Sequence, residues 1–240
     1  MDSLRLGWKI RKHLRLNFTR ISRIESTNIA KQLQLNSLIS TTRYVEKHML
    51  DARKFSDRFD LIEYALTQAT LNNGMYLEFG VHTGKSINFA AKRIKDTIHG
   101  FDSFEGLPEF WRDGYDEGVF DLGAKLPKVF RNVKLYKGWF DKTLPEFLGS
   151  DLNLGTIAYM HIDCDLYSST KTIFENLKDY IIPGTVIVFD DYMNHPGWET
   201  GEHQALQELV TKTGMKYKYV GFNQFGEQVA IKVIGSTEIK

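Results

Sequence analysis

Hydrophobic positions follow two spacings along most of this chain. Short apolar runs typical of buried strands alternate with stretches in which apolar residues recur every three or four positions, as in amphipathic helices. The predicted strands cover 75–79, 97–101, 133–136, 156–162, 185–189, 217–222 and 228–233. The predicted helices cover 57–71, 85–95, 144–148, 168–180 and 202–213.

This order of elements predicts an α/β fold with a Rossmann-like, seven-stranded, mostly parallel sheet. Strands alternate with helices until the last two strands, which form an antiparallel hairpin around 223–226. Alternation of this kind places helices on both faces of a parallel sheet. Ligands of such sheets bind beyond the carboxyl ends of the strands. The residues that directly follow each strand are therefore the candidate site residues.

The first part of the chain differs from the rest. We predict a helical N-terminal extension over 1–55 and one main domain over 56–240. Between Met1 and Ile24 there are seven Lys or Arg residues and one acid, with apolar residues at helical spacing between them. A basic amphipathic helix of this kind packs on the main domain or on a second subunit, lies on an anionic membrane, or resembles a transit peptide. We expect a homo-oligomer.

Composition narrows the classes of function. Lys and Arg number 31 against 30 Asp and Glu, so the chain lacks the basic field that non-specific nucleic-acid binding needs. The single cysteine, Cys164, excludes a disulfide framework and a cysteine-based zinc site. No apolar run approaches the length of a membrane span, and charges interrupt the N-terminus where a secretory signal would be apolar. We therefore expect a cytoplasmic protein.

A glycine turn joins the first strand to the helix that begins near Lys85. Gly80 and Gly84 bracket the turn, and backbone N–H groups exposed there can hold a carboxylate or a phosphate. The turn is not a Walker A loop, because no glycine stands at position 79, and His82 interrupts the Gly-x-Gly-x-x-Gly pattern. A helix-capping turn without a ligand explains it as well.

Asp102 strengthens the case for a ligand. It ends the second strand, 24 positions beyond Glu78 at the end of the first. An acid about 20 residues past a glycine turn is placed to accept hydrogen bonds from ribose hydroxyls. The two features together favour a nucleoside-containing ligand.

Four aspartates follow the strands near the centre of the sheet: Asp163 and Asp165 after 156–162, and Asp190 and Asp191 after 185–189. Carboxylates that converge on one crevice repel one another unless a cation or shared protons neutralise them. Oxygen-rich sites suit Mg²⁺. Alternatively, two of the four cap helices, with Asp165 as the candidate. His161, near the same strand end, is more often a core histidine than a ligand.

Four sequence blocks in order carry a family resemblance: Gly100–Pro108 (GFDSFEGLP), Gly138–Pro145 (GWFDKTLP), His161–Thr170 (HIDCDLYSST) and Gly184–Tyr192 (GTVIVFDDY). Over about residues 57–233 the chain resembles the macrocin O-methyltransferase family. These are class I methyltransferases that use S-adenosylmethionine (SAM) and Mg²⁺ to methylate sugar hydroxyls of natural products. The resemblance implies the class I methyltransferase version of the predicted fold.

The resemblance also implies roles for individual residues. It assigns SAM to the residues after the first three strands, namely Glu78, Gly80, Thr83, Gly84, Asp102, Ser103, Gly138, Trp139 and Phe140. It assigns the metal to Asp163, Asp190 and Asp191, and makes Asp163 the best-placed base. His195, in the loop after the fifth strand, is a second candidate base.

Three functions remain open. The first is methyl transfer from SAM to a hydroxyl of a small polyol, sugar or glycosylated metabolite, with Mg²⁺ activating the acceptor oxygen. The second is a metal-dependent glycosyltransferase that uses Asp163-Cys164-Asp165, an Asp-x-Asp triplet, to hold a metal and a nucleotide-sugar. The third is a non-catalytic module that has kept the fold and docks on a membrane or a partner.

Overall fold

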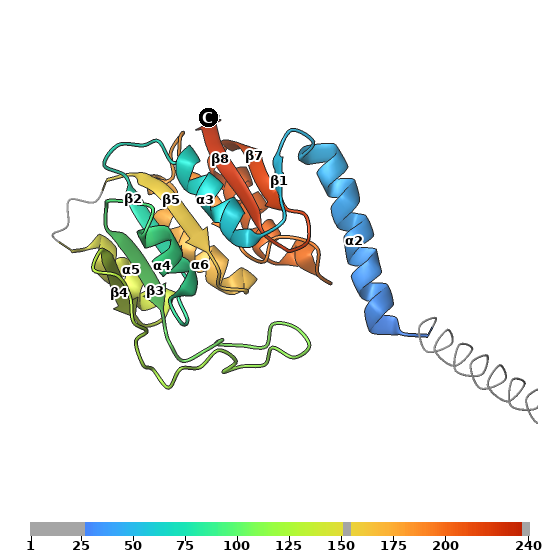
Figure 1. The fold of residues 1–240 in the computed structure, drawn as a ribbon, viewed down its shortest axis with the longest axis horizontal. Coiled ribbons are helices and arrows are strands. Elements are labelled where there is room, and N and C mark those ends of the chain that lie inside the picture. The colour runs from blue at the N-terminus through green and yellow to red at the C-terminus, as the bar shows by residue number, and fades with distance from the viewer. Residues whose placement is uncertain (1–26, 151–154, 237–240) are drawn as a thin grey trace, which may run out of the picture.

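A single eight-stranded sheet forms the centre of the molecule in a computed structural model, which describes residues 27–150 and 155–236 (Figure 1). The strand order is β1-β7-β8-β6-β5-β2-β3-β4. The strands are β1 (Arg53–Phe55), β2 (Met75–Phe79), β3 (Ile98–Asp102), β4 (Val133–Lys137), β5 (Ile157–Ile162), β6 (Val186–Phe189), β7 (Met215–Asn223) and β8 (Val229–Ser236). Only β8 is antiparallel to its neighbours in this sheet, so the mostly parallel α/β prediction is confirmed.

The predicted count of seven strands is wrong by one edge strand. The three residues of β1 pair in parallel with the end of β7, and Arg53 lies opposite Gly221. A Cβ atom at Gly221 would lie 2.8 Å from the Phe55 ring, so the glycine permits this close pairing. Two of the three β1 residues are exposed and charged, which gives the strand no apolar pattern to recognise.

Helices cover both faces of the sheet. They are α2 (Ile29–His48), α3 (Arg58–Gln68), α4 (Lys85–Ala91), α5 (Phe140–Leu148), α6 (Tyr167–Leu177) and α7 (Glu202–Thr213), with single 3₁₀ turns at Lys178–Tyr180 and Trp198–Thr200. One apolar cluster lies between the sheet and α5, α6 and α7, and a second lies between the opposite face and α3 and α4. Burial of these two clusters fixes the sheet between the helix layers.

Helix α2 rests on the α7 side of the domain through polar and aromatic contacts. The hydroxyl groups of Tyr44 and Tyr219 lie 2.6 Å apart, and the Trp198 indole N–H donates to Ser40 Oγ at 2.9 Å. The predicted basic helix before it lies outside the described residues. Among the helices that the structure describes, none is long and apolar enough to cross a membrane.

Candidate active site

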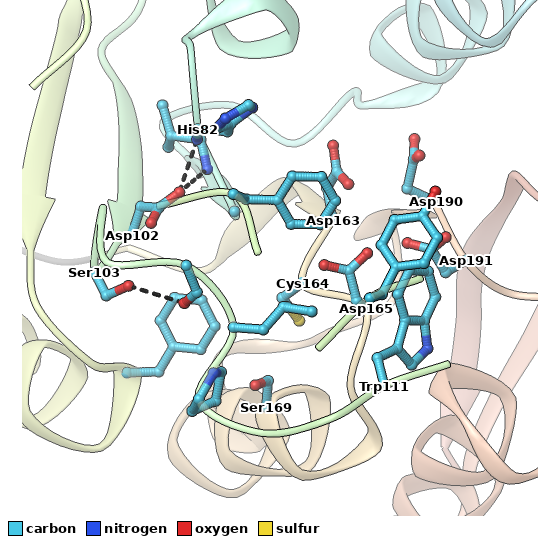
Figure 2. A pocket seen from close by; sticks show the side chains of 18 of the residues that line it. His82, Asp102, Ser103, Trp111, Asp163, Cys164, Asp165, Ser169, Asp190 and Asp191 are labelled. Carbon is cyan, nitrogen blue, oxygen red and sulfur yellow. Dashed lines mark hydrogen bonds between the residues drawn. The ribbon is translucent and has the colours of Figure 1, made fainter. Parts of the chain in front are cut away.

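The carboxyl ends of the parallel strands open into one cavity of about 750 Å³ (Figure 2). It lies where the chain order reverses between β2 and β5, the place at which open α/β sheets bind ligands. Most of the residues predicted for the site line it: Gly80, Thr83, Asp102, Ser103, Gly138, Trp139, Phe140, Asp163, Asp190 and Asp191. Three do not line it: Glu78, Gly84 and His195.

Asp102 holds the glycine turn from the neighbouring strand. Its Oδ2 accepts hydrogen bonds from the backbone N–H groups of Val81 and His82, at 2.8 and 2.7 Å (Figure 2). Its Oδ1 accepts from the N–H of Phe104 at 2.6 Å. A carboxylate offers about four acceptor positions, so one remains for a ligand. The structure therefore brings the turn and the acid together, as their spacing in the sequence indicates.

The two glycines of the turn serve different physical needs. A Cβ atom at Gly80 would lie 1.6 Å from the carbonyl oxygen of Asp163, so only glycine lets β2 and β5 end this close together. Gly84 adopts φ 78° as the N-cap of α4, a left-handed conformation that favours glycine. The turn is thus shaped both by the packing of two strands and by the start of a helix.

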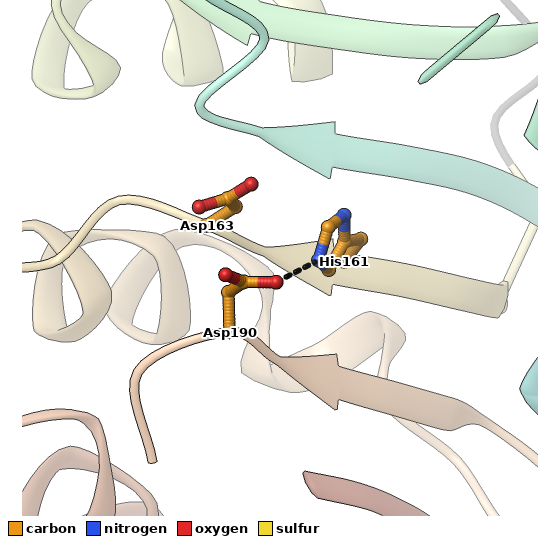
Figure 3. A group of neighbouring side chains, drawn as sticks. All are labelled: His161, Asp163 and Asp190. Atoms are coloured by element: carbon orange, nitrogen blue, oxygen red, sulfur yellow. Dashed lines mark ion pairs between the residues drawn. The ribbon is translucent and has the colours of Figure 1, made fainter. Parts of the chain in front are cut away.

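Glu78 lies beneath the turn and is 1% exposed. Its Oε1 accepts a hydrogen bond from Ser86 Oγ at 2.9 Å, and its Oε2 lies 3.2 Å from His161 Nδ1. His161 is itself fully buried, and its Nε2 lies 3.5 Å from Asp190 Oδ1 (Figure 3). The expectation that His161 is a core histidine is confirmed, and the structure adds two carboxylate neighbours.

All four aspartates after β5 and β6 line the cavity, but they form two groups that share Asp163, and neither group contains all of the predicted ligands. Asp163, Asp165 and Asp191 each offer an oxygen within 4.8 Å of the other two, and Asp163 forms a second such group with His161 and Asp190. The alternative that Asp165 caps a helix is excluded, because Leu166 is the N-cap of α6. Asp165 instead lines the cavity with a φ of 63°, unusual for a residue other than glycine.

The electrostatic environment divides these acids into two kinds. Burial and the neighbouring carboxylates raise the pKa of Asp163 and of Asp191 well above the ordinary value. Burial raises the pKa of Asp165 to about 6, although its contact with Asp191 opposes the change. Burial alone would also raise the pKa of Asp190, but His161 and Arg58 outweigh it and leave that pKa below the ordinary value. The first three acids lack sufficient positive charge, whereas Asp190 is compensated.

Two arginines that the sequence analysis did not identify supply the positive charge. Arg58 Nη1 lies 3.0 Å from Asp190 Oδ2, which also accepts from Gln228 at 3.1 Å. Arg112 donates to both carboxylate oxygens of Glu227 at 3.1 and 3.0 Å, and lies 3.8 Å from Asp191. Both arginines come from segments far from the aspartates in sequence, so no local sequence pattern predicts that they contact these acids.

His195 lies behind the acids rather than in the cavity. It is 4% exposed, and its Nε2 lies 3.2 Å from the carbonyl oxygen of Asp191. Its ring contacts the ring of Trp111, which does line the cavity, at a centroid distance of 6.0 Å. Its role as a base stays a prediction and requires movement of this loop.

Comparison with known proteins places the domain. The family model described as "Methyltransferase domain" matches residues 77–192. The 8-demethyl-8-(2,3-dimethoxy-alpha-L-rhamnosyl)-tetracenomycin-C 4'-O-methyltransferase of Streptomyces olivaceus is 30% identical over 163 residues, 56% of this chain and 60% of that protein. The demethyldecarbamoylnovobiocin O-methyltransferase of Streptomyces niveus is 30% identical over 125 residues, 44% of this chain and 46% of that protein. The chain thus spans only about half of the length of these relatives.

The solved structures show the same fold. The O-methyltransferase NovP superposes with a TM-score of 0.57 at 22% identity, covering 74% of this chain and 79% of that protein. At this identity the likeness shows the fold, which is the class I methyltransferase arrangement that the sequence predicts. The chain therefore has a class I methyltransferase fold, its residues 77–192 match the methyltransferase-domain model, and it is similar in sequence to the two Streptomyces O-methyltransferases.

Proposed function

We propose that this chain transfers a methyl group from SAM to a hydroxyl of a sugar, polyol or glycosylated metabolite, and that Mg²⁺ assists. The observation that carries this proposal is that one continuous cavity joins the glycine turn and Asp102 to the aspartates after β5 and β6. A donor bound at one end and an acceptor hydroxyl bound at the other would face each other inside this cavity. The methyl group would then pass between them without entering solvent. Holding two reactants in one orientation removes much of the barrier to a bimolecular reaction.

The donor end suits SAM, which supplies an electrophilic methyl group when bound. We assign the ribose hydroxyls to the remaining acceptor position of Asp102, beside Ser103. Trp139 begins α5 at the cavity wall and is 39% exposed, so its ring is accessible for stacking on the purine. Residues 80–83 line the same space and would take the methionine part.

The acid end fits a divalent cation on the chemistry of its donors. Asp163, Asp165 and Asp191 offer only oxygen atoms, which hard cations such as Mg²⁺ prefer. Burial raises their pKa values, and neighbouring carboxylates add to the effect, so a cation bound among them would favour the charged forms that coordinate it. Asp190 Oδ1 is buried without a hydrogen-bond partner within the described residues. We propose that Asp163, Asp190 and Asp191 hold Mg²⁺, with Asp165 beside them; the ion would make an acceptor hydroxyl more acidic.

The acceptor would lie between the acids and the segment after β3. Trp111 and Tyr115 contact each other at 5.0 Å between ring centroids, and both line the cavity. Aromatic rings suit the apolar face of a sugar, and carboxylates suit its hydroxyls. The bonds from Arg112 to Glu227 tie this segment to the β7–β8 turn and help to exclude water. Asp163, or Asp165 from the adjacent turn, would take the hydroxyl proton.

The two alternatives fit less well. A glycosyltransferase that used only Asp163-Cys164-Asp165 would leave the glycine turn and Asp102 without a role. A non-catalytic module would keep several buried, uncompensated carboxylates at a cost in stability without a ligand to offset it. Both Streptomyces relatives are named as O-methyltransferases, and the name of the one from Streptomyces olivaceus includes a rhamnosyl group, which supports the first function.

The deciding experiment is incubation with methyl-labelled SAM and MgCl₂ against a panel of glycosides, free sugars and nucleotide-sugars. We expect a labelled product that retains the label after purification and disappears on chelation with EDTA. Calorimetry with S-adenosylhomocysteine (SAH) and with a UDP-sugar runs in parallel. Saturable binding of the UDP-sugar together with no binding of SAH would overturn the proposal.

A further inference from the structure

His161 lies beneath the cavity, between the strand that leads to the glycine turn and the strand that leads to Asp190. It belongs to β5, between β2 and β6 in the sheet. Its direct partner in the register with β2 is Glu78, the last acid before the glycine turn. Asp190 follows β6 on the other side, and Figure 3 shows it pointing toward the imidazole.

A continuous chain of polar contacts passes through this histidine. From the donor side it runs from Ser86 in the first turn of α4 to Glu78 at 2.9 Å, and from Glu78 to His161 at 3.2 Å. It continues as an ion pair, not a hydrogen bond, from His161 Nε2 to Asp190 Oδ1 at 3.5 Å, and then from Asp190 Oδ2 to Arg58 at 3.0 Å. Ser86, Asp190 and Arg58 line the cavity, whereas Glu78 and His161 do not.

The chemistry of the three central groups makes the histidine difficult to replace. Glu78 and Asp190 are 1% and 6% exposed, so water cannot compensate their charges. A histidine that only filled space in the core would not need a carboxylate next to each ring nitrogen. Because the ring is rigid and inserted between neighbouring strands, it fixes the direction of both carboxylates at once.

On the basis of the proposed function, we propose that His161 is a positioning residue that aligns the donor turn with the acids. Through Nδ1 it orients Glu78, which holds α4 and therefore the turn. Through Nε2 it orients Asp190, and therefore one wall of the metal site. His161 touches neither donor nor acceptor. Its loss should therefore weaken binding at both ends of the cavity, although the two ends share no ligand.

The test compares His161→Phe, His161→Gln and the parent by calorimetry with SAH alone and with MgCl₂ alone. Partners that orient a metal ligand typically contribute 10- to 100-fold in affinity or activity. For His161→Phe we expect a loss of about tenfold or more for both SAH and Mg²⁺, in line with that range. His161→Gln keeps amide N–H donors and should recover part of both losses. His99→Phe, on β3 and away from the acids, is the matched control and should leave both affinities unchanged.

Four results would overturn the proposal. The first is His161→Phe with both affinities within twofold of the parent. The second is additive losses of Mg²⁺ affinity in His161→Phe combined with Asp190→Asn, because residues that act together must show coupling. If His161→Phe does not fold, His161→Gln decides: losses at both ends support the proposal, and a loss at neither end or at only one overturns it. A parent that binds neither SAH nor Mg²⁺ would overturn the proposed function itself, and this inference with it.

Discussion

The two ends of the cavity differ in how their polar groups are satisfied. At the donor end, one carboxylate satisfies the backbone: Asp102 accepts three backbone N–H bonds and fixes the turn that begins at Gly80. At the acid end, side chains dominate, and Asp163, Asp165 and Asp191 face one another with raised pKa values. At the donor end, Asp102 already provides acceptors for the N–H groups of the turn, whereas at the acid end the carboxylates require additional positive charge.

This difference shows what each end contributes to the proposed reaction. A self-consistent backbone turn binds its ligand without reorganising, which favours affinity and orientation. A cluster of incompletely neutralised acids stores electrostatic free energy that a cation releases on binding. We therefore expect substitutions at the donor end to change SAH binding and those at the acid end to change Mg²⁺ binding and stability.

The largest effect is expected at Asp191. Asp191→Asn should lower Mg²⁺ affinity by at least about 100-fold, because a direct ligand should exceed the contribution of the groups that orient it. SAH affinity should stay within about twofold. Without Mg²⁺, the same variant should be more stable by about 1–2 kcal/mol, since one of several repelling buried charges is gone. Calorimetry and thermal unfolding measure the three quantities; unchanged Mg²⁺ affinity would exclude Asp191 as a ligand.

At the donor end, Asp102→Asn should weaken SAH binding by about 10–30-fold. The substitution removes a charged acceptor for the ribose and places an amide N–H where Phe104 or the turn now donates. Mg²⁺ affinity should not change, because the acid cluster is built from other strands. Equal losses of SAH and Mg²⁺ affinity in this variant would mean that the two ends are not separate.

A smaller effect of about three- to tenfold in SAH affinity is expected for Trp139→Ala. The ring is half exposed, and stacking of an aromatic ring contributes about 0.5–1.5 kcal/mol. Trp111→Ala serves as the matched control, since Trp111 lies at the acid end and should change the KM of the acceptor instead. If both variants lost SAH affinity equally, the assignment of Trp139 to the purine would fail.

The strand that positions Asp102 also supplies a stability test in acid. Burial lowers the pKa of His99 on β3 to about 4, and the nearby Lys134 acts in the same direction. As pH falls, His99 therefore takes up a proton in the unfolded chain before it does so in the folded chain. The free energy of unfolding decreases between about pH 6.5 and pH 4 as a result. The loss should reach about 1–2 kcal/mol, and His99→Phe should abolish it. Urea unfolding of the two proteins at pH 7 and pH 4.5 measures the difference; identical pH dependence would contradict the assignment.

Much of the fold could be predicted because its signals are local. Each buried strand of the parallel sheet is a short apolar run, and α7 was predicted at its observed bounds, Glu202–Thr213. The edge strand β1 could not be predicted, because its pairing with β7 depends on a glycine 168 positions away from Arg53. The site could also be predicted from the residues that follow each strand, because parallel strands bring their carboxyl ends to one edge of the sheet.

The residues that the sequence did not reveal act across long separations. Arg58 and Arg112 reach the acids from the start of α3 and from the segment after β3, with no pattern that links them to Asp190 or Asp191. Asp165 looked like a helix cap from its position before α6, yet Leu166 occupies the cap. Glu78 was placed against the ligand, but it lies below the turn against Ser86 and His161. Such roles depend on the packed structure rather than on spacing.

The central claim is that one cavity binds SAM at the glycine turn and a divalent cation at the aspartates. Its most direct test is a crystal structure of the chain grown with SAH and MnCl₂, with anomalous diffraction recorded for manganese. We predict SAH along the 80–84 turn with its ribose at Asp102, and a manganese peak among Asp163, Asp190 and Asp191, next to Asp165. SAH bound elsewhere, or manganese bound away from these carboxylates, would contradict the account.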